Sequence, residues 1–110
     1  MKIELVSYDS SWPQRFELEK KTLQAILGDS FEFEIEHIGS TSVPGLDSKP
    51  VIDILGGCRE LNELGLTPKM MTDAGYNYIG EHEIQFPNRR FFYRDDKGRR
   101  ISNIHIVPID

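Results

Sequence analysis

Apolar residues recur with helical spacing early in the chain, between Ser11 and Gly28. This spacing predicts an amphipathic helix that begins after Ser11, with Pro13 in its first turn and Gln14 completing a capping box. Gly28 is expected to end the helix. Charged residues, Glu19 among them, are expected mostly on the other helix faces. The predicted buried stripe consists of Trp12, Phe16, Leu23, Ile26 and Leu27.

Two strand patterns follow the helix. Residues 31–38 read Phe-Glu-Phe-Glu-Ile-Glu-His-Ile, and this strict alternation predicts a strand with glutamates on one face. By the same alternation His37 shares the other face with the phenylalanines and Ile35. Residues 51–55 form an apolar run broken only by Asp53, which is typical of a central strand covered on both faces. Gly56-Gly57 is expected to end that strand.

The second half of the chain alternates between helical and extended tendencies. Residues 59–75 favour a helix that is interrupted where Thr67-Pro68 begins a second one, and Gly75 is expected to close it. A hairpin turn is predicted at residues 95–98, because Gly98 suits a left-handed position. Short strands are predicted at residues 3–6, 76–79, 90–94 and 99–107. Together these elements predict a mixed β-sheet with helices packed on it, an α/β or α+β fold.

Composition narrows the classes of function. The 110 residues fit a single domain, and the net charge of -5 argues against binding extended nucleic acid, which needs a basic face. No apolar run is long enough to span a membrane, and the first residues lack a signal-peptide core. The lone Cys58 forms no internal disulfide and is expected to be a packing residue. A cytoplasmic protein fits these features.

The segment from Ile35 to Leu55 carries the candidate chemistry. Gly39 lets the backbone approach a ligand closely, and the hydroxyl and N–H groups of the next three residues form a plausible nest for phosphate oxygens. An aspartate inside an apolar strand is costly unless it is hydrogen-bonded, paired or bound to a metal. Asp53 is therefore expected either to hold Mg²⁺ beside the phosphate or to bond the loop amides. The predicted phosphate-binding nest consists of Gly39, Ser40, Thr41 and Ser42.

These residues resemble those of a known family. The run Ile35-Glu-His-Ile-Gly-Ser-Thr-Ser-Val-Pro-Gly-Leu46, followed by Lys49-Pro50 and Val51-Ile-Asp-Ile54, is similar to the GrpB family. Segments 6–13, 90–92 and 103–107 match the same family pattern, so the resemblance spans nearly the whole chain. It implies a nucleotidyltransferase-like fold of the DNA-polymerase-beta type over residues 1–110. Family members typically continue into a helical C-terminal part, so we expect a shortened domain.

The resemblance also implies a site. In the nucleotidyltransferase superfamily, Gly-Ser grips a nucleoside triphosphate and carboxylates on adjoining strands bind two Mg²⁺ ions. Asp53 would thus be the catalytic and metal-binding residue. The superfamily pattern has a second acid two residues later, where this chain has Leu55. The late strand has His105 in place of a third acid. Two-metal catalysis requires several oxygen ligands, so one carboxylate and one histidine are a small set for it.

Four further residues have competing interpretations. His37 is either a core histidine or a ligand-binding residue. If the isoleucines on either side of His105 face the core, His105 faces either the site or solvent. Lys49 either reaches a phosphate or is solvated. Arg90 shares a face with Arg94 and would form a cationic wall, unless these are ordinary surface arginines.

Three hypotheses about function follow. The first is an enzyme that transfers a nucleotidyl or phosphoryl group with Mg²⁺. The second is a binding module for a nucleotide or another phosphorylated small molecule that has lost the metal pair, and Leu55 favours it over the first. The third is an interaction domain whose exposed sheet associates with another chain, for example as a homodimer.

Overall fold

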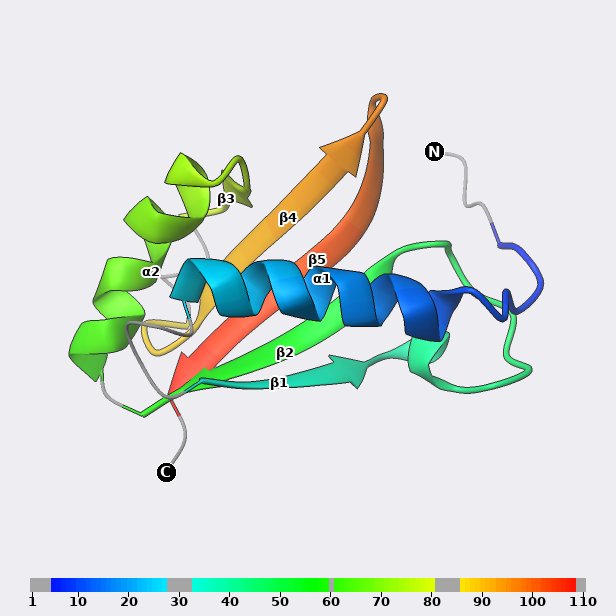
Figure 1. The fold of residues 1–110 in the computed structure, drawn as a ribbon, viewed down its shortest axis with the longest axis horizontal. Helices are drawn as coiled ribbons and strands as arrows, with labels where there is room; N and C mark the ends of the chain where they lie inside the picture. The colour runs from blue at the N-terminus through cyan, green and yellow to red at the C-terminus, as the bar shows by residue number, and fades with distance from the viewer. Residues whose placement is uncertain (1–4, 28–32, 60, 81–85, 109–110) are drawn as a thin grey trace.

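The fold is a five-stranded mixed sheet with two helices, an α+β architecture. The computed structural model describes residues 5–27, 33–59, 61–80 and 86–108. Strand order is β1-β2-β5-β4-β3; β2 and β5 run parallel, and the other neighbours are antiparallel (Figure 1). Its elements in chain order are α1 (Trp12–Leu27), β1 (Phe33–Ile38), the short 3-10 helix η1 (Ser40–Ser42), β2 (Ile52–Cys58), α2 (Leu61–Asp73), β3 (Asn77–Tyr78), β4 (Arg90–Asp96) and β5 (Arg99–Pro108).

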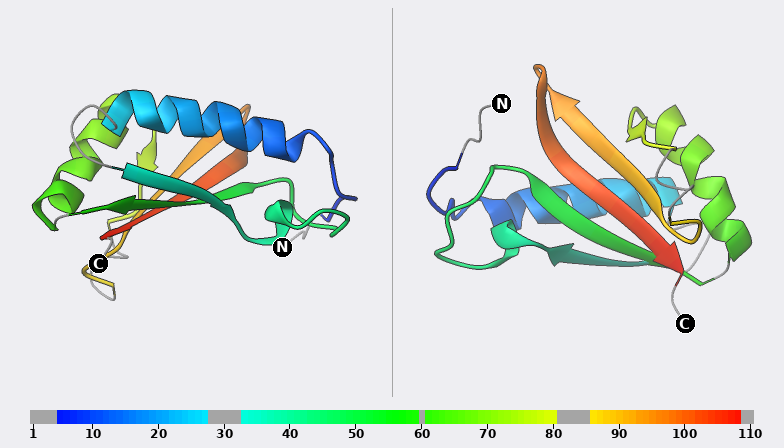
Figure 2. Two further views of the ribbon diagram at one scale, coloured as in Figure 1. Left: turned by 60° about the horizontal axis from the view of Figure 1, so that its bottom comes forward. Right: turned by 180° about the vertical axis from the view of Figure 1, so that it is seen from behind.

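Both helices pack on the same face of the sheet (Figure 2). Side chains alternate along each strand, so Ile52, Ile54, Ile104 and Ile106 face the helices and are buried. Alternate positions such as Asp53 face the other way and are only half-buried. The prediction that the Asp53 strand is covered on both faces is therefore wrong for the described residues. An aspartate is tolerated there because its face of the sheet is not closed over by a helix.

Helix α1 lies across the sheet and follows its predicted stripe, with one exception. Trp12, Leu23 and Leu27 are fully buried. Glu19, expected on a solvated face, is 4% exposed and belongs to the same stripe. Its carboxylate accepts hydrogen bonds from Tyr76 and from the Arg94 guanidinium, which stands on β4 opposite the helix. These two long-range partners, invisible to local periodicity, stabilise a buried charge.

Strand β2 does not end at Gly56-Gly57 as expected but continues to Cys58. The two glycines lie between β1 and β5 and pair in register with both neighbours. A central position in the ladder outweighs the usual tendency of glycine to break a strand. The thiol of Cys58 is fully buried in the core, so the prediction that it is a packing residue is confirmed.

Helix α2 is continuous, so the predicted interruption at Thr67-Pro68 is wrong. Proline lacks the N–H that would bond the carbonyl of Leu64, four residues earlier. The buried hydroxyl of Thr67 donates to that carbonyl instead, at 2.8 Å. Gly75, at φ 96°, ends the helix as predicted, and the N–H of Tyr76 bonds back to the carbonyl of Met71.

The remaining predicted elements are largely present. Lys97 and Gly98 both have positive φ and join β4 to β5 in the expected hairpin. The first predicted strand is reduced to an isolated bridge between Val6 and Ser48. The predictions for residues 3–4, Gly28 and 31–32 lie outside the described residues. No helix in the described ranges is long and apolar enough to cross a membrane.

The Thr67 hydroxyl provides a test of how α2 tolerates its proline. Thr67→Val keeps the side-chain shape but leaves the buried carbonyl of Leu64 without a donor, so the free energy of unfolding should fall by about 1–2 kcal/mol. Thr72→Val removes an exposed hydroxyl from the same helix and should cost less than about 0.5 kcal/mol. Urea denaturation measures both. Equal losses would contradict this role for Thr67.

Candidate functional site

The turn after β1 and the aspartate of β2 meet at one place. Gly39 has a φ of 77°, which favours glycine. A Cβ at this position would stand 2.8 Å from Asp53 Oδ2, so the carboxylate packs directly against the Gly39 backbone. Only glycine allows this approach without a shift in the structure. The predicted convergence of the Gly-Ser turn and Asp53 is thus present.

The other oxygen of Asp53 is held by Asn103 on β5. The two residues are register partners on the parallel strands, and Asn103 Nδ2 donates to Asp53 Oδ1 at 3.0 Å. On its far side, Asn103 Oδ1 accepts a 3.5 Å bond from Arg100, whose guanidinium lies 3.9 Å from the centre of the Tyr93 ring. The Asp53 carboxylate is therefore oriented by a side-chain network on the face of the sheet away from the helices.

A hollow of about 640 Å³ opens beside this network. It contains three of the predicted site residues, Ser40, Lys49 and Asp53. A smaller hollow of about 310 Å³ adjoins the same loop and adds Arg99 to the cationic side chains nearby. The full lining of the larger hollow is Leu5, Ser40, Asp47, Ser48, Lys49, Val51, Asp53, Arg100 and Asn103.

Hydroxyl groups fix the loop that forms one wall. Ser40 Oγ and Ser48 Oγ lie 2.5 Å apart, and Ser48 donates to the carbonyl of Lys49 at 2.9 Å. Because the proton of Ser48 is used in that second bond, Ser40 donates the first. Backbone bonds in both directions between Val6 and Ser48 tie the N-terminal segment to the same loop. The lining residues thus come from four separate parts of the chain.

Six predicted site residues do not line the hollow, and one of them, Gly39, packs against Asp53 instead. Thr41 is fully buried and bonds the His37 ring at 2.9 Å, while Ser42 bonds back to the carbonyl of Gly39. His105 faces away from the core, as its isoleucine neighbours required, but lies farther along β5, with its ring edge against Phe91. Arg90 lies on the helix-facing side of β4 and donates to the carbonyl of Pro87. It is therefore on the opposite face of the sheet from Asp53.

His37 lies on the helix side of β1. Its ring stacks on Phe16 of α1 with centroids 4.9 Å apart, and burial lowers the pKa of the imidazole below its ordinary 6.5, while the charge of Asp53 opposes this shift. The geometry favours the core interpretation: His37 supports the loop through Thr41 rather than facing the hollow.

Asn103 was the main omission from the predicted site. The alternation that places His105 on the outward face places Asn103 there too, two residues earlier. Its pairing with Asp53 depends on β2 and β5 being parallel neighbours, which the sequence does not specify locally. No sequence pattern pointed to Ser48 or Arg100 as site residues. The bridge to Val6 places Ser48 at the hollow, and the β4–β5 hairpin places Arg100 there.

Metal ligands are sparse at this site. Among the residues that the structure describes, no group of three or more His, Cys, Asp or Glu side chains is placed to hold a metal ion. Leu55 occupies the position at which the nucleotidyltransferase pattern described above has its second acid. These residues therefore do not fit a centre that holds two ions.

Comparison with known proteins agrees with this architecture. The family model described as GrpB protein matches residues 2–110. The chain belongs to the GrpB family. A crystal structure of the conserved protein GrpB from Enterococcus faecalis superposes with a TM-score of 0.82 at 34% identity, covering 97% of this chain and 62% of that one.

Two relatives show the extent of the similarity. The UPF0157 protein YqkA of Bacillus subtilis is 32% identical over 105 residues, 96% of this chain and 29% of YqkA. The glutamate-rich protein GrpB of Alkalihalophilus pseudofirmus is 27% identical over 106 residues, 96% of this chain and 59% of that protein. The GrpB-family chain thus spans under two thirds of the length of these relatives.

The contact between Gly39 and Asp53 can be tested by adding one methyl group. Gly39→Ala places a Cβ against the carboxylate and forces a residue with a side chain into a positive φ, so stability should fall by more than about 2 kcal/mol. Gly45→Ala is the matched control, because Gly45 also has a positive φ, 82°, but nothing lies within 4 Å of its added Cβ. It should lose only about 1–2 kcal/mol. Equal losses in chemical denaturation would show that the carboxylate does not crowd Gly39.

His37 should make stability depend on pH. Because its pKa is lowered in the folded state, the unfolded chain takes up a proton more readily, and stability is lost as the pH falls through about 6.5. His37→Gln should remove that part of the loss between about pH 7 and pH 5. His105→Gln serves as the control and should retain it. Identical pH profiles for the wild type and His37→Gln would contradict the assignment.

Proposed function

We propose that the hollow beside Asp53 binds the phosphate groups of a nucleotide or another phosphorylated small molecule. The observation that carries this proposal is the convergence of Ser40, Lys49 and Arg100 around one cavity. A volume of about 640 Å³ lies within the usual range for small-ligand sites. The hydroxyl and the two cations are donor groups suited to phosphate oxygens.

The local charge supports an anionic ligand despite the acidic chain. Lys49, Arg99 and Arg100 gather along two adjoining hollows, in a protein of net charge -5. Lys49 is exposed, and its long stem gives the ammonium group a wide reach. Arg100 is already oriented over Tyr93 and toward Asn103. A cationic rim of this kind attracts anions locally even when the whole molecule is negative.

Asp47 and Asp53 would repel a bare phosphate, which favours a ligand that arrives with a divalent cation. Mg²⁺ bound to phosphates is commonly held by one or two protein carboxylates, and these two line the hollow. Such an ion would neutralise phosphate charge. Since Leu55 replaces the second acid of the pair, binding without nucleotidyl transfer accounts for the residues better than two-metal catalysis does.

Ser40 has to change partners for a ligand to use it as a donor. In the structure its hydroxyl donates to Ser48, so contact with a phosphate requires rotation of that proton toward the hollow. Ser48 keeps its own bond to the carbonyl of Lys49 during this change. The Ser40 hydroxyl is thus engaged by one hydrogen bond that a charged acceptor would outcompete.

Isothermal calorimetry with ATP, with and without Mg²⁺, tests the proposal. Ser40→Ala and Lys49→Gln should each weaken binding about tenfold, because each removes a donor to a charged oxygen. Ser42→Ala is the control for the loop, since the Ser42 hydroxyl donates to the carbonyl of Gly39 within the turn. Ser48→Ala removes the competing partner of Ser40 and should bind at least as tightly as the wild type.

The metal arm of the experiment separates the two forms of the proposal. Tighter binding of ATP in the presence of Mg²⁺ supports the role of Asp47 and Asp53. An affinity that does not change with Mg²⁺ supports direct contact of the phosphates with Lys49 and Arg100 alone. Unchanged affinity in both Ser40→Ala and Lys49→Gln would rule out this hollow as the ligand site.

A further inference from the structure

Strand β1 forms one edge of the sheet. It comes first in the strand order, and among the residues that the structure describes it pairs only with β2 (Figure 1). The outer side of an edge strand presents a row of backbone N–H and C=O groups that can pair with another strand. The opposite edge, β3, has only two residues, whereas β1 has six. β1 is therefore the edge that offers the longer row for pairing.

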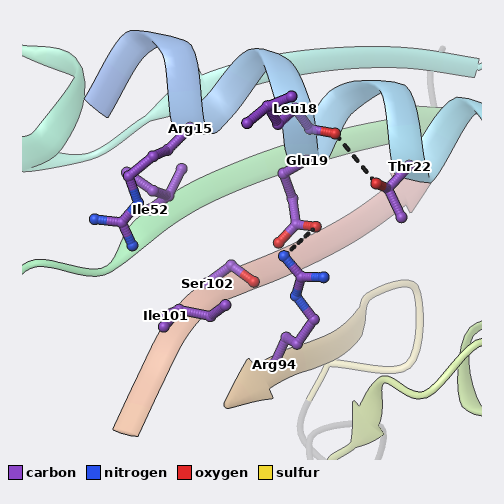
Figure 3. A pocket seen from close by; sticks show the side chains of 8 residues that line it. All are labelled: Arg15, Leu18, Glu19, Thr22, Ile52, Arg94, Ile101 and Ser102. Atoms are coloured by element: carbon purple, nitrogen blue, oxygen red, sulfur yellow. Dashed lines mark hydrogen bonds and ion pairs between the residues drawn. The ribbon is translucent and has the colours of Figure 1, made fainter. Parts of the chain in front are cut away.

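Helix α1 covers one face of this edge. Phe16 of α1 stacks on His37 of β1 with 4.9 Å between the ring centroids, and Ile35 beside it is buried. Figure 3 shows the same helix tied to β4 farther across the sheet, where Glu19 and Arg94 form an ion pair at 3.1 Å. A strand added at β1 would place every second side chain on this helix-covered side, which suits apolar residues.

On the other face, the register of the strands forms a groove beside the edge. Glu36 is opposite Leu55, and Glu34 is opposite Gly57, which is in turn opposite Val107. Because Gly57 has no side chain, the second of these rows is open in its middle. The five residues line a hollow of about 120 Å³. Both glutamates are exposed, while the leucine and the valine are half-buried, so the groove has an apolar floor and an acidic rim.

We propose that β1 binds an extended segment of another protein by strand addition, and that this segment has lysine or arginine at every second position. Neighbouring strands lie about 4.8 Å apart, so a long basic side chain on the added strand reaches over β1 to the rim of the groove. There its charge pairs with Glu34 or Glu36. The hollow at Asp53 lies toward the other end of β2, and this proposal does not rest on its ligand.

The charges of β1 argue against a second copy of this chain as the partner at this edge. Two copies of β1 related by a two-fold axis, with their helices on the same side, would run antiparallel. Full overlap of the two strands would then place Glu34 opposite Glu36, and like charges directly opposite each other are destabilising. A basic strand converts the same repulsion into attraction, and the net charge of -5 also favours a basic partner.

Three short peptides test the proposal by titration into ¹⁵N-labelled protein. With the capped peptide Arg-Val-Arg-Val-Arg, we expect the backbone amide signals of β1 to shift and saturate. The capped peptide Glu-Val-Glu-Val-Glu should leave them unchanged. The third peptide has the arginine sequence with every backbone nitrogen methylated, which removes the donors that an added strand needs but keeps its charges. It should not bind.

Variants of the two glutamates connect these shifts to the groove. Glu34→Gln and Glu36→Gln should each raise the half-saturation concentration of the arginine peptide about threefold, as expected for an exposed ion pair. The double variant should raise it about tenfold. Glu17→Gln removes a carboxylate from an exposed position on α1 and should leave the titration unchanged. Glutamine keeps the size of the side chain, and the amide spectrum of each variant checks that it is folded.

Three results would overturn the proposal. The first is the absence of saturable shifts in β1 with the arginine peptide. The second is equal binding of the methylated peptide, which would mean that charge attracts the peptide without strand pairing. The third is the same affinity for the wild type and the double glutamine variant, which would place the peptide elsewhere.

Discussion

The close contact between the Asp53 carboxylate and the Gly39 backbone determines how the rest of the site is arranged. One carboxylate oxygen lies against the turn after β1, and the other accepts a hydrogen bond from Asn103 on β5. A single side chain thereby joins β1, β2 and β5 at one end of the sheet. The loop that carries Ser40 follows directly from this turn, so its position depends on the same contact.

The two faces of the sheet have different surroundings, the packed core on one side and the polar hollow on the other. On the helix side, Phe16 stacks on His37, and Glu19 links α1 to β4. On the other side, Asp53, Asn103 and Arg100 form a polar network beside the hollow. Alternation along β2 and β5 is what separates these environments, since neighbouring residues on one strand face opposite ways.

The sequence was most informative where one local rule acted alone. Alternation correctly placed Ile35 inside, and the Gly-Ser turn and Asp53 did converge. Local rules failed where distant residues intervened. Arg94 and Tyr76, far from Glu19 in the sequence, stabilise its charge inside the core. A local contact was missed as well: the Thr67 hydroxyl donates to the carbonyl that Pro68 cannot reach. Asn103 was missed because its role depends on which strands are neighbours.

A crystal structure of the protein soaked with a nucleoside triphosphate and Mn²⁺ would test the central claim most directly. The account predicts phosphate density in the hollow within hydrogen-bond distance of Ser40 and Lys49, with any metal next to Asp53. Phosphate bound on another surface, with the Ser40–Ser48 hydrogen bond intact and the hollow filled only by water, would contradict it.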